Sequence, residues 1–170
     1  VQLSSLSSYH DIVTNNEVDH HGFIGSIPNK RWLQGFEKHA FVQQLVKKTS
    51  EVLEKPLKIH EDKVWFRVCR PQHDDSNDIH RDTWFSNYEG LINLYLPLSG
   101  SFVDSAMPVV PFSHNWTDEE VKPSMEEGSG KYIKNGVAYS ACTVEYCKYP
   151  IELHRPDVRL GDVMIFNPRM

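Results

Sequence analysis

The spacing of apolar residues changes along this chain, and the change limits the folds that it can adopt. Between Asn29 and Glu54 the apolar residues recur at three- and four-residue steps, with Lys, Glu and Gln between them. This spacing predicts one amphipathic helix over residues 29–54, ended by Pro56. Beyond it come only short runs rich in β-branched and aromatic residues, each closed by Gly, Pro or polar residues. One helix followed by many short strands is typical of a sandwich or jelly roll with helical buttressing.

The short β-type runs predict the strands of this fold. Residues 91–98 are apolar at nearly every position, so we expect a central strand that is covered on both faces. Residues 118–130 are acidic and contain Gly and Pro, which predicts a surface excursion. The other predicted strands are residues 64–70, 107–111, 139–149 and 163–166, the last entered through a tight Gly161-Asp162 turn. We therefore expect a mainly β core over residues 64–170, in one domain with the helix.

Composition narrows the possible partners. At 170 residues the chain has the length of a single domain. Its formal net charge is -5 and its Lys and Arg residues are scattered, which argues against nucleic acid as a partner. No apolar run approaches the roughly 20 residues that a membrane span needs, so we expect a soluble, cytoplasmic protein. The three cysteines match neither a disulfide framework nor a zinc knuckle, and we expect free thiols.

A His-x-Asp sequence at His80 and Asp82 is the main candidate for a metal site. If this segment is extended, both side chains lie on one face, with their Cα atoms about 7 Å apart. A neutral imidazole and a carboxylate can then close on one metal ion. Joined by a second imidazole from a facing strand, they form the facial triad that leaves adjacent positions open on a non-haem Fe(II) ion.

Other histidines are weaker candidates for metal binding. His73 and Asp75 have the same His-x-Asp form, but they lie in a polar, turn-forming run that argues against a fixed strand geometry. His154 precedes the Gly161-Asp162 turn, where we expect it to point away from the site. His114 follows a short predicted strand, and a hydrogen-bonded turn residue is the ordinary interpretation of it.

Four segments follow one another in a fixed order along the second half of the chain. They are His80-Arg81-Asp82-Thr83-Trp84, residues 92–98, residues 107–114 and residues 160–166. In this order they resemble the phytanoyl-CoA dioxygenase-like branch of the Fe(II)/2-oxoglutarate-dependent oxygenases, over about half of the chain. The resemblance implies a cupin-like double-stranded β-helix in which His80 and Asp82 bind Fe(II). It also implies 2-oxoglutarate as co-substrate, O₂ as oxidant and hydroxylation of a small molecule, which we expect to be a biosynthetic intermediate.

The resemblance also implies residues that complete the site. In that family a segment similar to residues 161–166 leads directly into the second histidine ligand, and an arginine further on binds 2-oxoglutarate. We expect both just beyond Met170. Asn93 and Tyr95 share one face of their strand and are candidates to hydrogen-bond the co-substrate. Trp84 is a candidate to line the substrate pocket, and Arg67 to bind an anionic substrate.

Two alternative functions fit the same sequence. One is a cupin-like metalloenzyme that uses no 2-oxoglutarate, which would lack the distal arginine. The other is a jelly-roll binding module without catalytic activity, which would bind no Fe(II). Metal binding and co-substrate binding therefore separate the three hypotheses.

Overall fold

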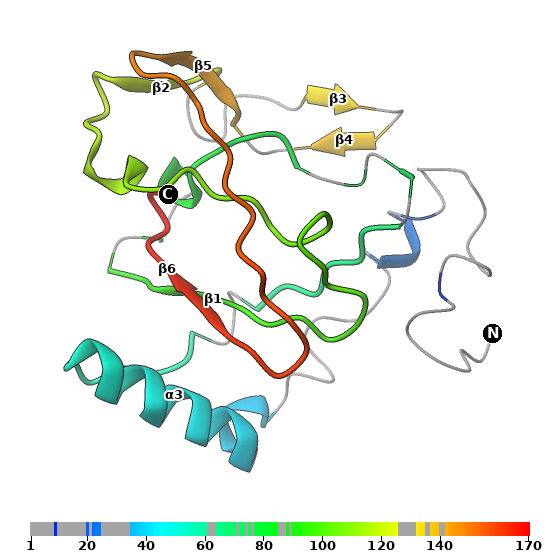
Figure 1. Ribbon diagram of the computed structural model, residues 1–170, viewed down its shortest axis with the longest axis vertical. Coiled ribbons are helices and arrows are strands. Elements are labelled where there is room, and N and C mark those ends of the chain that lie inside the picture. The colour runs from blue at the N-terminus through cyan, green and yellow to red at the C-terminus, as the bar shows by residue number, and fades with distance from the viewer. Residues whose placement is uncertain are drawn as a thin grey trace.

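The computed structural model describes residues 9, 20, 22–24, 35–60, 64–70, 72–73, 75, 77–84, 88, 90–125, 132–134, 137–139 and 142–170. Within these ranges the longest regular element is helix α3, and the strands form three two-stranded antiparallel pairs (Figure 1). Much of the remaining chain in these ranges runs without regular secondary structure. No jelly roll is identified in this part of the chain.

Helix α3 spans Ala40–Leu53, a later start than the predicted one at Asn29. A short 3-10 helix, η2 (Phe36–Lys38), precedes it, and residues 29–34 lie outside the described ranges. His39, whose backbone is extended, is the N-cap of the helix, and its Nδ1 accepts a hydrogen bond from the amide of Phe41 at 3.3 Å. It ends at Glu54, whose left-handed conformation (φ 52°) turns the chain back before Pro56.

Strands β1 (Asn93–Tyr95) and β6 (Met164–Phe166) form the pair that leads to the candidate site. Asn93 lies opposite Phe166 and Tyr95 lies opposite Met164. Opposed residues of an antiparallel pair share a face, so these four side chains lie on one side of the ladder. β1 is shorter than the predicted strand at 91–98 and pairs with β6 alone among the described strands. Among the described strands, β1 therefore does not have the central position in a sheet that the sequence predicted.

Strands β2 (Val121–Pro123) and β5 (Val144–Cys147) form a second antiparallel pair. β2 lies inside residues 118–130, and Val121 is only 3% exposed. Asp118, Glu119, Lys122 and Ser124 are exposed, so the described part of the predicted surface excursion lies at the surface but contains a paired strand. The third pair joins β3 (Tyr132–Lys134) to β4 (Val137–Tyr139).

Two further predicted strands have extended backbone but little pairing. Along residues 64–70 the side chains alternate between half-buried and exposed up to Cys69, as in a strand, yet no ladder is assigned to them among the described residues. Residues 107–111 contribute one isolated bridge, in which the backbones of Val109 and His154 exchange hydrogen bonds of 2.9 and 2.8 Å. Both segments are less regular than their composition predicts.

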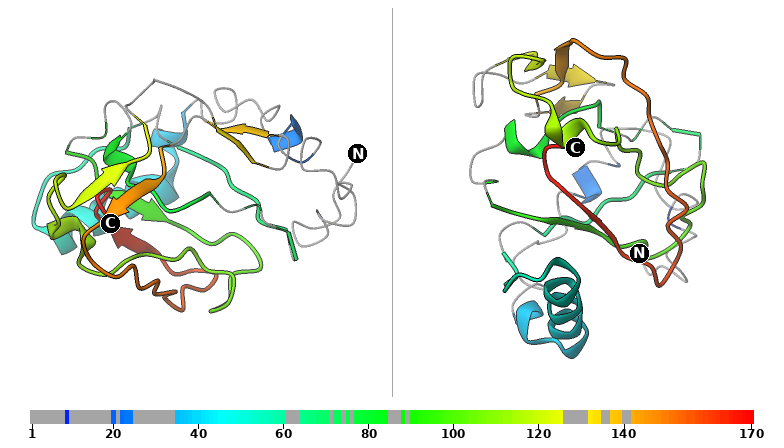
Figure 2. Two further views of the ribbon diagram at one scale, coloured as in Figure 1. Left: turned by 90° about the horizontal axis from the view of Figure 1, so that it is seen from above. Right: turned by 60° about the vertical axis from the view of Figure 1, so that its left-hand side comes forward.

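The β1–β6 pair lies between α3 on one side and the β2–β5 pair on the other (Figures 1 and 2). After β6 the chain returns to the short green helix η4 (Asp82–Trp84), beside which the C-terminal end is marked in Figure 1. In the ranges given above, no helix is both long and apolar enough to cross a membrane.

Candidate functional site

His80 and Asp82 lie together, as the His-x-Asp spacing predicts. His80 Nε2 is 3.3 Å from Asp82 Oδ1, and the two side chains are 19% and 27% exposed. The local backbone differs from the expected extended strand, because Asp82 begins the 3-10 helix η4. Just before the pair, the carbonyl of Ile79 accepts a hydrogen bond from the amide of Val144 (3.0 Å), which ties this segment to the start of β5.

Two neighbouring groups orient the pair. The ring of His80 donates from Nδ1 to the carbonyl oxygen of Asp78 at 2.6 Å, since a carbonyl can only accept. In the neutral imidazole this places the lone pair on Nε2, the nitrogen that faces Asp82. On the other side, Asn93 Nδ2 donates to Asp82 Oδ2. His80 Nε2 and Asp82 Oδ1 therefore face each other, each side chain held by a neighbour of its own.

This geometry fits two ligands of one transition-metal ion. Ligand atoms about 2.1 Å from an ion, at a right angle to each other, lie about 3 Å apart. The 3.3 Å between His80 Nε2 and Asp82 Oδ1 is close to that separation. An imidazole and a carboxylate are two of the three ligands in a facial triad for Fe(II). Among the residues that the structure describes, no group of three or more His, Cys, Asp or Glu side chains is placed to hold a metal.

The segment after β6 is hydrogen-bonded to the metal-binding candidate. The carbonyl of Pro168 accepts from the amides of Asp82 (2.9 Å) and Thr83 (3.4 Å). The chain that follows β6 therefore lies directly beside η4. This contact joins residues that are far apart in the sequence, and nothing in the local sequence around Asp82 predicts it.

Arg81 lies between the two candidate ligands in sequence but points into the protein. It is 3% exposed, and Nη2 donates to the carbonyls of Ser113 (2.6 Å) and Trp116 (3.2 Å). Asp118 Oδ1 accepts from Arg81 Nη1 at 3.4 Å and from Arg169 Nη2 at 2.9 Å. Burial, and next the neighbouring Arg169, lower the pKa of Arg81. We refer to Arg81, Asp118 and Arg169 as the arginine clamp, a feature that sequence reasoning missed.

In the second His-x-Asp sequence, His73 and Asp75, the aspartate is bound by an arginine. Asp75 is buried and accepts from Arg70 Nη2 at 2.7 Å, and from Arg70 Nε and the Arg70 amide at 2.8 Å each. Buried His20, which bonds to Tyr9, has its Nε2 3.6 Å from the same carboxylate. Burial acts to raise the pKa of Asp75, but the hydrogen bonds from Arg70 outweigh it and hold the pKa below its usual value. Asp75 is therefore one half of an ion pair and is not available beside His73 for a metal.

The other candidate residues differ in burial and in the element that carries them. Trp84 is half-buried at the end of η4, a 3-10 helix in place of the extended segment expected at His80 and Asp82. Tyr95 shares the face of β1 that carries Asn93. Arg67 is exposed on the outward side of residues 64–70. His154 is exposed, and His114 Nδ1 is buried with no hydrogen-bond partner among the described residues.

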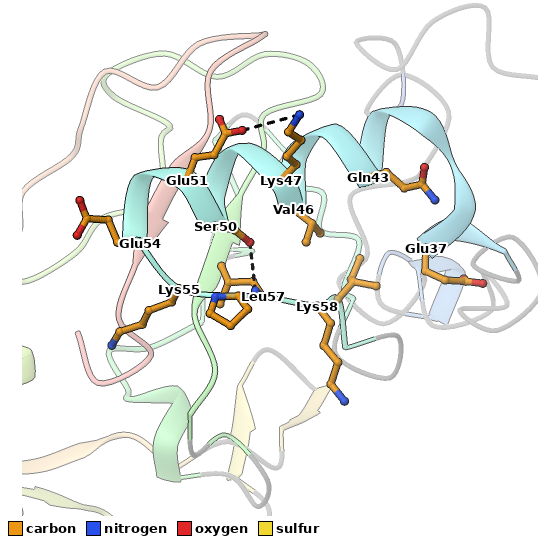
Figure 3. A pocket seen from close by; sticks show the side chains of 12 residues that line it. Glu37, Gln43, Val46, Lys47, Ser50, Glu51, Glu54, Lys55, Leu57 and Lys58 are labelled. Atoms are coloured by element: carbon orange, nitrogen blue, oxygen red, sulfur yellow. Dashed lines mark hydrogen bonds and ion pairs between the residues drawn. The ribbon is translucent and has the colours of Figure 1, made fainter.

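An open groove of about 800 Å³ lies elsewhere, between α3 and the chain that turns back after it (Figure 3). The amide of Leu57 donates to Ser50 Oγ at 3.1 Å and fixes this return. Charged side chains such as Lys47 and Glu51 line its rim. None of the residues predicted for the metal or co-substrate site lines the groove, and we assign it no role.

Comparison of the chain with protein-family models, with curated proteins and with solved structures finds no match. The chemistry of His80, Asp82 and their neighbours is therefore the basis on which a function can be inferred.

Proposed function

We propose that this protein is a non-haem Fe(II), 2-oxoglutarate-dependent dioxygenase with a double-stranded β-helix fold, which hydroxylates a small-molecule substrate. The observation that carries the proposal is the convergence of His80 Nε2 and Asp82 Oδ1 at 3.3 Å. Each residue is oriented by a separate neighbour, Asp78 for the histidine and Asn93 for the aspartate. Such support of the ligands by a surrounding shell is typical of metal sites.

The chain's own residues bind and orient in this proposal. Fe(II) held by His80 and Asp82 would supply, with 2-oxoglutarate and O₂, the oxidation of an unactivated C–H bond. In the family that the sequence resembles, the segment after the strand corresponding to β6 carries the second histidine ligand. The hydrogen bonds from Asp82 and Thr83 to Pro168 support the proposal, because they hold the segment after β6 against η4.

The co-substrate and substrate lie against the face of the β1–β6 pair that carries Asn93. Tyr95 on this face is our candidate to hydrogen-bond 2-oxoglutarate. Trp84, half-buried at the end of η4, is our candidate for the substrate pocket. Arg67 is exposed and has no carboxylate partner among the described residues, so it remains our candidate to bind an anionic group.

The test is an anaerobic titration of the full-length protein with Fe(II) and then with 2-oxoglutarate. We expect a weak visible charge-transfer band when the keto acid chelates the iron, and its loss in Asp82→Ala. His73→Ala is the matched control, because Asp75 is bound by Arg70 and that histidine is not a ligand in the proposal. This control should keep the band.

Two other results would replace the proposal with a different function. Iron binding without a band would favour a cupin-like metalloenzyme that uses no 2-oxoglutarate. Absence of iron binding would favour a binding module without catalytic activity. A band that survives in Asp82→Ala would show that the ligands were wrongly assigned.

A further inference from the structure

We infer that Asn93 is a positioning residue that holds the Asp82 carboxylate so that only one of its oxygens binds the metal. This inference rests on the proposed function, because it concerns the same site. Asn93 Nδ2 donates to Asp82 Oδ2, whereas Oδ1 is the oxygen that faces His80 Nε2. A carboxylate only accepts, so the amide nitrogen of Asn93 must be the group that points toward it. In this arrangement Oδ1 is the oxygen that binds the metal, and Oδ2 is the oxygen that accepts the hydrogen bond from Asn93.

The backbone of Asn93 is well placed to fix this contact. Asn93 begins β1 and lies directly opposite Phe166 of β6 in the antiparallel ladder. Its side chain thus projects from a paired strand, whereas Asp82 lies at the start of a 3-10 turn. A donor on a strand can hold a carboxylate on a turn more rigidly than the turn alone could. The sequence predicted that Asn93 lies near the site, but not that Asp82 is its partner.

One-oxygen binding has a chemical consequence for an oxygenase. A carboxylate that binds through both oxygens fills one more position on the metal than a carboxylate that binds through one. That position is needed when a chelating co-substrate and O₂ share the open side of a facial triad. By occupying Oδ2, Asn93 keeps the position open. Neutral Asn also does so without adding a second negative charge beside Asp82.

The experiment compares metal binding by the full-length protein and by three variants. Asn93→Leu keeps the approximate volume of the side chain and removes the donor, and Asn93→Ala removes both. Asn115→Ala, at an exposed position, is the matched control. Anaerobic Co(II) titration gives the affinity, and the visible Co(II) spectrum reports the coordination number. Thermal unfolding without metal checks that each variant is folded.

We expect both Asn93 variants to bind Co(II) about 10- to 100-fold more weakly, as is usual when a residue that orients a ligand is lost. Their spectra should also change shape, because the freed carboxylate can bind through both oxygens. In the Asp82→Ala background, Asn93→Leu should have no further effect, since its partner is gone. Asn115→Ala should match the wild type.

Unchanged affinity and spectrum in Asn93→Leu would overturn the inference and leave the proposed function standing. An equal loss with and without Asp82 would also overturn it, because Asn93 would then act independently of the carboxylate. If the wild-type protein bound no metal, the proposed function would fall and this inference with it. If metal bound but 2-oxoglutarate gave no band, the Co(II) affinities would still decide the role of Asn93.

Discussion

Asp75 and Asp82 occupy the same position in two His-x-Asp sequences, yet the fold gives them opposite partners. Asp75 is buried with Arg70, a permanent cation that neutralises it through two side-chain hydrogen bonds. Asp82 is half-exposed, and its side-chain partners are an imidazole and an amide, neither of which is a permanent cation. A buried carboxylate requires a cation nearby. For Asp75 the protein supplies that cation itself, whereas the described residues place no permanent cation in contact with Asp82.

Glu120 is the residue whose titration the structure predicts most directly. Its carboxylate accepts from the hydroxyl of Tyr149, from Lys148 Nζ (2.9 Å) and from the amide of Thr117 (3.0 Å). These bonds, that of Tyr149 first, lower the pKa of Glu120 to about 2. Because the folded pKa lies below the unfolded value of about 4.3, the stabilisation is complete above that value and is lost as the pH falls through about 2.

Tyr149→Phe should therefore raise the pKa of Glu120 toward its usual range, because it removes the largest of the three contributions. A ¹³C NMR titration of the carboxylate measures this directly. Tyr146→Phe is the control, since Tyr146 is exposed and contacts Lys122 rather than Glu120. An unchanged Glu120 pKa in Tyr149→Phe would contradict the predicted hydrogen bond.

At the scale of elements, helix α3 packs against the rest of the protein through one buried face. Val42 is 1% exposed, whereas Val52 on the same helix is 70% exposed. Val42→Ala should destabilise the protein by about 2 kcal/mol, from the buried methyl groups and the space they leave. Val52→Ala should have almost no effect, because Ala is the better helix former and little surface is lost. Urea unfolding measures both, and equal losses would show that α3 is attached through another face.

The sequence predicted elements better than it predicted their partners. The three- and four-residue spacing locates α3, and the Gly161-Asp162 turn correctly precedes β6, because both are decided by nearby residues. The turn at Asp82 could not be predicted, since its amide bonds to Pro168 across about half of the chain. The burial of Val121 was not predicted because acidic neighbours dominate the composition of residues 118–130, and of the described part of that segment it alone is buried. The candidate ligands were readable as a motif, but the roles of Asn93 and Arg81 depended on distant partners.

At the scale of the whole molecule, three segments that are remote in sequence meet at Arg81, the residue between His80 and Asp82. The arginine clamp joins Arg81 in the ligand segment to Asp118 in the loop before β2, and to Arg169 after β6. Arg169 also donates to the carbonyl of Trp116 at 3.0 Å, an acceptor that it shares with Arg81. Two guanidinium groups with one carboxylate leave a positive charge behind Asp82.

If His80 and Asp82 bind a metal as proposed, the hydrogen bonds to Pro168 also set when, during folding, that site forms. Contacts within α3 are local and can form in microseconds, whereas contacts between residues far apart in sequence must first close a long loop of chain. The pairing of residues 82 and 168 is such a contact. In refolding experiments the far-ultraviolet signal of the helix should recover before Co(II) absorbance appears. Simultaneous recovery would mean that the ligand pair is set by its own turn, independently of the segment after β6.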